Sequence, residues 1–237
     1  MSEIVIRDEN GYNQIFAPIG ATPVRQRRRS DWMLAQIERV GARRVLEIGC
    51  GTGENAAVLA ASTQAEVIAV DISPAFVSAA RERHSAPNLR FERLDLLGDQ
   101  LLEFGQFDLV CGNGILHHLV VHLPRVLMAL RQLTNPGGGM AFIEPNFLNP
   151  DCAFAFGTKL GRRFARLEPD EMAFKPGELR QALADAGWHD VVVKMRDFLV
   201  PGLPLSLVKP TLALEPLLEG SAVTSWLAQS HFMTARA

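Results

Sequence analysis

The stretch that decides the fold covers residues 44–55 and reads Arg44-Val45-Leu46-Glu47-Ile48-Gly49-Cys50-Gly51-Thr52-Gly53-Glu54-Asn55. It begins with a short apolar, β-branched-rich run, which is typical of a buried strand in a parallel sheet. Alternating glycines follow, and then an Ala- and Leu-rich helical segment over 55–61. A strand that passes through glycines into a helix places the loop backbone at the carboxyl end of the sheet, where open α/β sheets bind ligands. The stretch therefore predicts a nucleotide-type site.

Two acids and the glycine spacing distinguish this site from a dinucleotide site. The dinucleotide fingerprint is Gly-x-Gly-x-x-Gly, whereas Gly53 arrives one residue early. Glu47 lies in the strand end, where a carboxylate would repel a pyrophosphate but suit a ligand with ammonium and sulfonium charges. Asp71 ends the next strand, about twenty residues on, as expected for a group that accepts hydrogen bonds from ribose hydroxyls.

This combination resembles the class I S-adenosylmethionine (SAM) dependent methyltransferases. The resemblance covers about residues 40–145, with an acid after the third strand, a fourth strand followed by Asn113, and a fifth strand that ends at Glu144. It implies a SAM-dependent methyltransferase with SAM as cofactor and S-adenosylhomocysteine as product. The cofactor-binding residues that it implies are Glu47, Gly49, Gly51, Gly53, Asn55, Asp71, Ile72, Asp95, Leu96 and Asn113.

The resemblance also implies what these residues do. The glycines let the backbone approach the methionine portion of SAM, which Glu47 orients. Asp71 holds the ribose hydroxyls, and Asp95 approaches the adenine edge together with the Leu96 amide. Asn113 contributes its backbone near the sulfonium, and Asn55 helps from the helix start.

The rest of the core follows the same alternation of elements. Strands are predicted near 44–49, 66–71, 89–93, 107–111 and 138–144, and helices over 54–62, 74–83 and 121–133. A helix that ends at Gly187 and strands near 191–195 and 226–235 complete the pattern. Alternation predicts a parallel sheet covered on both faces. Together with the resemblance, it indicates a Rossmann-like, seven-stranded, mostly parallel α/β sheet whose last strand is antiparallel, with helices on both faces and lid insertions.

The 237 residues are enough for one sizeable core, so a single domain is expected. Its parts are a helical lid over 1–40, a SAM-binding core over 41–145, a substrate-lid insertion over 146–175 and a C-terminal part over 176–237. The last contains a Pro- and Leu-rich insertion over 201–220, whose prolines are expected to prevent a long helix. This insertion is then a second lid, a membrane-facing patch or a dimer contact.

A run of arginines over 25–29 precedes Ser30 and Asp31, which resemble the N-cap of an amphipathic helix. The favoured interpretation of the run is a solvated, charged helix face. A clamp for the SAM carboxylate or for an acidic substrate is the second interpretation, and a nucleic-acid patch is the third.

The fourth strand is followed by two histidines, His117 and His118. One of them is a candidate general base, which is needed only if the acceptor arrives protonated. A structural role in packing the loop is the alternative. A metal is not expected, since no suitably spaced carboxylate or cysteine accompanies the histidines. The residues expected to contact the substrate are Tyr12, Phe16, His117, Asn146 and Phe154.

These features favour an enzyme that methylates a hydrophobic or aromatic small molecule, in the first place at oxygen, with nitrogen or carbon as alternatives. A nicotinamide-dependent oxidoreductase is disfavoured by the glycine spacing, by Glu47 and by the lack of an obvious Tyr-x-x-x-Lys pair. A non-catalytic SAM-binding subunit is a third possibility.

Charge and composition limit which partners and which cellular compartment are expected. The formal net charge of −2 gives no reason to expect nucleic acid. The three cysteines form neither a paired framework nor a metal-ligand spacing, which favours buried thiols in a reducing compartment. The N-terminus has no long apolar region and no run is long enough to span a bilayer. We therefore expect a cytoplasmic protein without stable membrane insertion that acts on a small molecule, with a homodimer as one option for its assembly.

Overall fold

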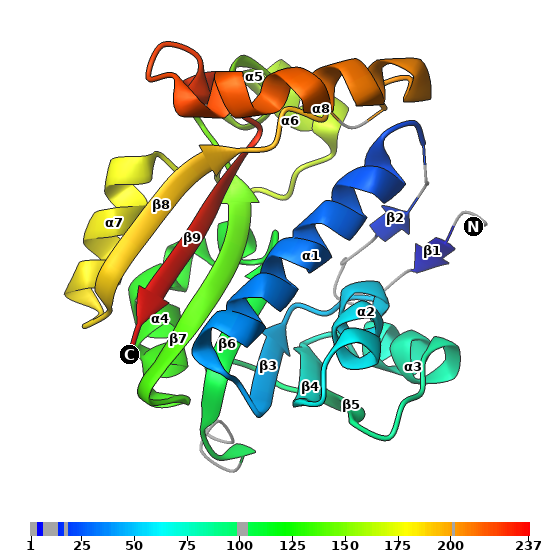
Figure 1. Ribbon diagram of the computed structural model, residues 1–237, viewed down its shortest axis with the longest axis vertical. Coiled ribbons are helices and arrows are strands. Elements are labelled where there is room, and N and C mark those ends of the chain that lie inside the picture. Colours follow the sequence, from blue (N-terminus) through cyan, green and yellow to red (C-terminus); the bar gives the residue numbers. More distant parts are fainter. Residues whose placement is uncertain (1–3, 7–13, 17–18, 99–103, 201) are drawn as a thin grey trace.

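The computed structural model describes residues 4–6, 14–16, 19–98, 104–200 and 202–237. Its centre is a seven-stranded sheet with the strand order β5-β4-β3-β6-β7-β9-β8 (Figure 1). The strands are β3 (Arg44–Ile48), β4 (Glu66–Asp71), β5 (Leu89–Arg93), β6 (Phe107–Asn113), β7 (Thr134–Pro145), β8 (His189–Arg196) and β9 (Ser230–Arg236). Six run parallel, and β9 runs antiparallel between β7 and β8. The predicted fold is confirmed. Two short strands, β1 (Ile4–Ile6) and β2 (Gln14–Phe16), pair separately.

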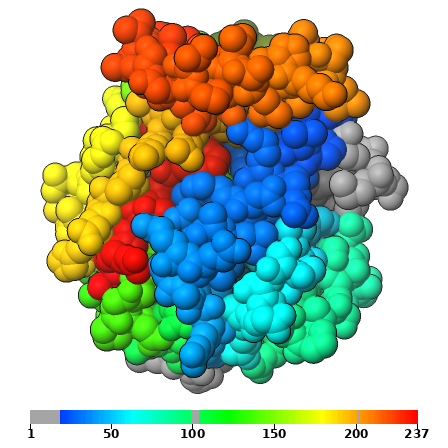
Figure 2. Space-filling view, viewed as in Figure 1, coloured from blue at the N-terminus to red at the C-terminus, as the bar shows by residue number. Residues whose placement is uncertain are grey.

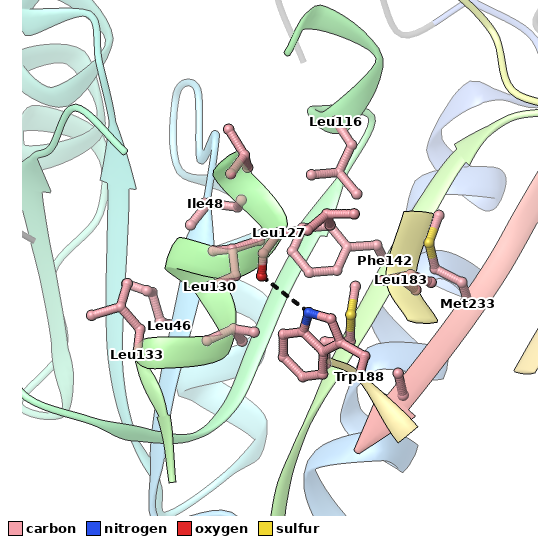
Figure 3. Packing of buried hydrophobic residues seen from close by; sticks show 14 of the residues in the cluster. Leu46, Ile48, Leu116, Leu127, Leu130, Leu133, Phe142, Leu183, Trp188 and Met233 are labelled. Carbon is pink, nitrogen blue, oxygen red and sulfur yellow. Dashed lines mark hydrogen bonds between the residues drawn. The ribbon is translucent and has the colours of Figure 1, made fainter. Parts of the chain in front are cut away.

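Helices cover both faces of the sheet (Figure 1). On one face lie α4 (Leu123–Gln132) and α7 (Pro176–Asp185). Figure 3 shows how Trp188 packs there among buried leucines, with its indole Nε1 donating to the Leu127 carbonyl at 3.1 Å. On the other face lie α1 (Thr22–Val40), α2 (Glu54–Ser62) and α3 (Pro74–Arg83). The strands between them are therefore buried on both faces, as their apolar sequences require.

The first helix begins earlier than predicted. The expected N-cap at Ser30-Asp31 is wrong, because α1 starts at Thr22 with a proline in its first turn. Proline is favoured at that position since its backbone N–H would have no partner there. Ser30 lies buried in mid-helix, where its hydroxyl donates to the Gln26 carbonyl at 3.2 Å. The arginine run is consequently part of the helix.

The expectation that prolines prevent a long helix over 201–220 is also wrong. Helix α8 (Leu205–Gly220) contains Pro210 and Pro216 in its interior. Each proline removes one backbone donor, but its fixed φ is compatible with the helix. Val208 on the inner face belongs to a buried cluster with Ala21 and Leu199, so tertiary packing compensates for the missing hydrogen bonds. The last strand begins at residue 230, and the residues before it form a short helical turn, η4 (Ser225–Leu227).

The insertion after β7 folds into two short helices, α5 (Pro150–Gly157) and α6 (Lys159–Ala165). Asn149 caps α5, since its side-chain oxygen accepts from the Asp151 and Cys152 amides at 2.9 and 3.1 Å. The Asn149 amide group also donates to the Leu227 carbonyl in η4. These helices lie at the same end of the molecule as α8 (Figure 1). Among the described helices, none is long and apolar enough to cross a membrane.

Candidate active site

The glycine loop joins β3 to α2 at the carboxyl end of the sheet. Gly49 and Gly53 have φ values of +66° and +86°. A Cβ at Gly49 would lie 2.5 Å from the Ile115 side chain, and one at Gly53 would lie 2.7 Å from the Phe91 ring. Only glycine fits both the backbone conformation and the space at these two positions.

Asp71 at the end of β4 holds the same loop from the side. Its Oδ2 accepts from the Gly51 amide at 2.9 Å, and its Oδ1 accepts from the Ser73 amide at 3.0 Å. The acid that the sequence assigned to the ribose is therefore also an anchor for the loop backbone. Both carboxylate oxygens of Asp71 are thus bonded to the backbone on the two sides of the strand end.

A cavity of about 1390 Å³ opens beside this loop. Nine of the ten predicted cofactor residues line it, with Gly53 as the exception: Glu47, Gly49, Gly51, Asn55, Asp71, Ile72, Asp95, Leu96 and Asn113. They come from the ends of β3, β4, β5 and β6, so the topology brings together residues that are distant in sequence. This is the position at which parallel α/β sheets bind ligands.

Glu47 is the most unusual group in the cavity wall. It is 2% exposed, and its Oε1 accepts from the Asn55 amide at 2.6 Å. Its Oε2 is buried and has no hydrogen-bond partner among the described residues. Burial raises the pKa of Glu47 to about 7; the Asn55 bond opposes this, and the nearby charges of Glu54 and Asp71 add to it. A buried carboxylate oxygen without a partner favours a cationic ligand group at this place.

Glu144, at the end of β7, organises the turn that follows β6. Its Oε1 accepts from the amides of Ile115 and Leu116 at 3.0 and 2.7 Å. Its Oε2 accepts from the His117 amide at 3.2 Å and lies 2.8 Å from the His117 ring Nδ1. The carboxylate is fully buried, whereas the His117 side chain is 12% exposed. A proton on Nδ1 is thus hydrogen-bonded to Glu144, which leaves Nε2 as the acceptor nitrogen.

Sequence reasoning did not assign Glu144 a role. The sequence does contain an indication of such a role, because Glu144 is an acid at the end of an apolar strand, as Glu47 is. Buried carboxylates in such strands require partners, and Glu144 finds four nitrogen atoms in one turn of the chain.

His118 lines the cavity, whereas His117 is not among the described residues that line it. His118 also contacts the segment after α6. Its Nδ1 lies 3.3 Å from Glu171 Oε1, and its ring lies 4.1 Å from the His117 ring. Burial lowers the pKa of His118, but the adjacent Glu171 carboxylate, with the charges of Glu144 and Glu168, outweighs burial and raises the pKa above its ordinary value. The protonated form therefore makes an ion pair with Glu171.

The sequence argument against a metal considered residues near the histidines in the chain, and the fold adds the carboxylate of Glu171 from a distant segment. One ligand atom from each of His117, His118 and Glu171 lies within 4.8 Å of the others. The direct contact between His118 and Glu171 accounts for this cluster as an ion pair, so a metal is not needed to explain it.

None of the predicted substrate residues that the structure describes is among those that line the cavity, although the His117 ring lies 4.1 Å from the ring of His118, which does line it. The Asn146 amide is fully buried and donates to the Trp226 and Ala228 carbonyls at 3.0 and 2.8 Å. Neither Asn146 nor Phe154, which is 47% exposed on α5, is among the described residues that line the cavity. Tyr12 lies outside the described residues, and Phe16 is described only as a part of β2.

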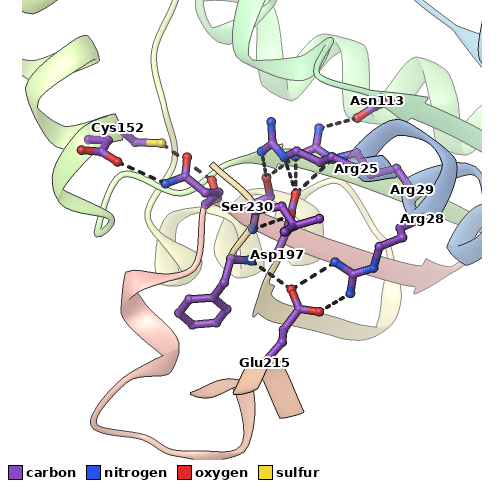
Figure 4. Close-up of polar contacts among 12 residues, drawn as sticks. Arg25, Arg28, Arg29, Asn113, Cys152, Asp197, Glu215 and Ser230 are labelled. Carbon is purple, nitrogen blue, oxygen red and sulfur yellow. Dashed lines mark hydrogen bonds and ion pairs between the residues drawn. The ribbon is translucent and has the colours of Figure 1, made fainter. Parts of the chain in front are cut away.

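The arginine run is mostly internal, which corrects the favoured interpretation as a solvated face. Figure 4 shows Arg25 and Arg29 converging on Asp197, with Nε of Arg25 at 2.6 Å and Nη2 of Arg29 at 2.9 Å from its Oδ2. Arg29 also donates to the Asn113 side-chain oxygen at 2.9 Å. Burial lowers the pKa of Arg29 to about 10, as does the Arg25 charge, against the raising effect of Asp197. Arg27, with its side chain 60% exposed, does lie on a solvated face.

Comparisons with known proteins agree with this geometry. A family model described as a methyltransferase domain matches residues 46–140. The trans-aconitate 2-methyltransferase of Deinococcus radiodurans is 34% identical over 170 residues, which are 67% of this chain and 64% of that protein. Lovastatin diketide synthase mokB of Monascus pilosus is 30% identical over 174 residues, or 65% of this chain and 6% of that protein. The chain thus spans less than two thirds of either relative.

Solved structures show the same fold. The CurJ carbon methyltransferase aligns with a TM-score of 0.55 and 22% identity, covering 82% of this chain and 48% of that one. A SAM-dependent methyltransferase from Mesorhizobium loti aligns with a TM-score of 0.61 and 19% identity, covering 88% of this chain and 98% of that one.

Proposed function

The chain carries a class I SAM-dependent methyltransferase domain, and from this premise we propose that it methylates a hydrophobic or aromatic small molecule at an atom that arrives protonated, in the first place a hydroxyl oxygen. The observation that supports a protonated acceptor best is the contact between Glu144 and the His117 ring. Methylation of a free amine would need no such base.

The residues at the glycine loop suit the cofactor. The unpartnered Oε2 of Glu47 is placed to accept a hydrogen bond from the ammonium group, and Asp71 and Asp95 supply acceptors for the ribose and the adenine. SAM, when bound, supplies a methyl group activated by a positively charged sulfur. The side chains around it need only position the acceptor and exclude water.

In this proposal His117, whose side chain is 12% exposed and whose ring lies against that of the cavity-lining His118, is the general base. Glu144 holds the proton on Nδ1 and stabilises the imidazolium that forms when Nε2 takes a proton from the acceptor. His118 lies against the His117 ring and, paired with Glu171, positions the segment after α6 over the cavity. Leu119, Val121 and Ala165 add apolar surface to the same cavity, which supports a hydrophobic acceptor.

An acidic carbon is the second candidate for the methylated atom. The same base would remove a proton from carbon, and the chain is similar to a carbon methyltransferase structure and to polyketide synthases. In the deciding experiment the protein is incubated with SAM and with matched phenols, carbon acids or amines, and formation of S-adenosylhomocysteine is measured. Turnover of phenols supports the oxygen proposal, turnover of carbon acids supports the second candidate, and turnover of amines alone contradicts both. Absence of SAM binding by calorimetry would contradict the function as a whole.

Replacing Asp71 with Ala is expected to weaken SAM binding at least about tenfold, since the variant loses a ligand acceptor and the anchor of the Gly51 amide. Calorimetric titration with SAM measures the effect. The matched control is Asp185→Ala, which removes an exposed acid on α7, away from the cavity. Equal affinity of the two variants would rule out the proposed role of Asp71.

A further inference from the structure

Helix α8 presents its side chains in the reverse of the usual order for a surface helix. Several of its leucines face outward: Leu205 is 67% exposed, Leu214 55% and Leu217 72%. Among the leucines of α8, Leu212 packs against the buried cluster of Ala21, Leu199 and Val208. The two carboxylates of α8 face inward, where Glu215 pairs with Arg28 and Glu219 with Arg196. A helix against water normally places its apolar residues inward and its charges outward. The exposed side of α8 is therefore more apolar than the water-facing side of an ordinary surface helix.

The outward residues form a continuous stripe. Leu207, Pro210, Leu214 and Leu217 recur at intervals of three and four residues, which places them on one side of a helix. Val208 and Glu215, both buried, fix the opposite side against the protein. Lys209 is the one exposed charged residue in this fully described helix. Figure 2 shows that α8 extends across the whole end of the molecule in that view.

Helix α6 lies at the same end (Figure 1) and combines apolar with basic residues. Leu160 and Phe164 are 57% and 75% exposed, and Lys159 and Arg163 are exposed beside them. Its sequence, Lys159–Ala165, contains no acid. We call the large apolar and the basic exposed residues of α6, α8 and the segment up to η4 the apolar end; they are Lys159, Leu160, Arg163, Phe164, Leu205, Leu207, Lys209, Pro210, Leu214, Leu217, Val223 and Trp226.

We propose that the apolar end docks onto an anionic lipid bilayer, with α8 lying in the plane of the surface. Exposed leucines and aromatic rings with cations among them are the combination by which helices bind the interface of anionic membranes. Charge favours a lipid surface over a second copy of the chain, because two copies meeting through this end would bring Lys159, Arg163 and Lys209 against like charges. An anionic bilayer instead complements all three.

The test is co-sedimentation of the full chain with vesicles of phosphatidylcholine alone and of phosphatidylcholine with about one third phosphatidylglycerol. Partitioning onto the anionic vesicles is expected to be at least about tenfold stronger and to weaken in high salt. Failure to sediment with the anionic vesicles overturns the proposal.

Variants then locate the contact. The double variant Leu214→Glu, Leu217→Glu is expected to reduce partitioning onto anionic vesicles at least about tenfold. The matched control Met128→Glu alters a residue that is 48% exposed on α4, away from the apolar end (Figure 1), and should bind as the wild type does. An equal loss in the control overturns the proposal.

Further readouts separate docking from misfolding and from self-association. SAM affinity and the unfolding temperature should be unchanged in the double variant; if they change, the charge reversal Arg163→Glu, Lys209→Glu is tested instead and should weaken anionic binding equally. A wild-type dimer in solution that the double variant converts to a monomer, without vesicle binding, would assign the apolar end to a second copy and overturn the proposal.

Discussion

Replacing Glu47 with Gln is expected to weaken SAM binding about 100-fold at alkaline pH while stabilising the SAM-free protein. The variant keeps the shape of the side chain and an oxygen for the Asn55 amide but loses the buried negative charge. In the free protein that charge is unfavourable, because burial is the main cause that raises the Glu47 pKa from 4.5 to about 7. With SAM bound, the same charge would face an ammonium group and become favourable.

The sign of the pH dependence follows from the direction of that shift. A folded-state pKa above the unfolded value means that the ionised form destabilises the free protein, progressively from pH 4.5 to about 7 and fully above it. The gain in unfolding temperature on Glu47→Gln should thus be larger at alkaline than at acidic pH. SAM affinity of the wild type should rise through neutral pH, with proton release that calorimetry detects in buffers of different ionisation enthalpy.

The control is Glu92→Gln, which neutralises a half-exposed carboxylate in an ion pair with Arg81 outside the cavity. It should change neither SAM affinity nor its pH dependence. A Glu47→Gln variant that binds SAM as tightly as the wild type would show that this carboxylate does not hold the cofactor.

Replacing His117 with Ala is expected to lower kcat by a factor of about 10² to 10⁴ with an acceptor that must lose a proton, while SAM affinity stays unchanged. Glu144→Gln should lower kcat in the same direction, since an amide can donate to Nδ1 and so place the imidazole proton on Nε2, where a base must be unprotonated. Single-turnover rates at saturating SAM and acceptor measure the chemical step.

His118→Ala is the comparison, because it removes the adjacent ring and the Glu171 ion pair but leaves the Glu144 contact. It should affect acceptor KM more than kcat. If His117→Ala turns over at nearly the wild-type rate, the base is not His117, and a larger loss in His118→Ala would transfer that role to its neighbour.

The cofactor side of the site could be predicted because its determinants are local. Strand, glycine loop and helix are contiguous over 44–62, and Asp71 and Asp95 each follow directly from a strand end. Parallel strands bring their carboxyl ends together, so the order of motifs already implies the neighbours. The proposed acceptor side depends on distant pairs. His117 and Glu144 are 27 positions apart, and nothing local indicates that Glu171 returns to His118.

The errors in α1 and α8 have the same origin. Local signals at Ser30 and at Pro210 and Pro216 favoured a helix start and a helix break, but packing against the rest of the chain outweighed them. The partner of Arg29 is Asp197, which is 168 positions away and buried with a φ of +78°. Sequence shows the charge of the arginine run and not the acid that neutralises it.

Helix α6 belongs to two surfaces at once, since its last residue, Ala165, lines the cavity while Leu160 and Phe164 form part of the apolar end. If the apolar end binds a bilayer as proposed, the enzyme would encounter an acceptor dissolved in that bilayer by diffusion along the surface. Its rate would then depend on the mole fraction of acceptor within the bilayer rather than on its bulk concentration, and added inert lipid would slow turnover by dilution along the surface. One short helix would in this way determine whether the enzyme obeys solution or interfacial kinetics.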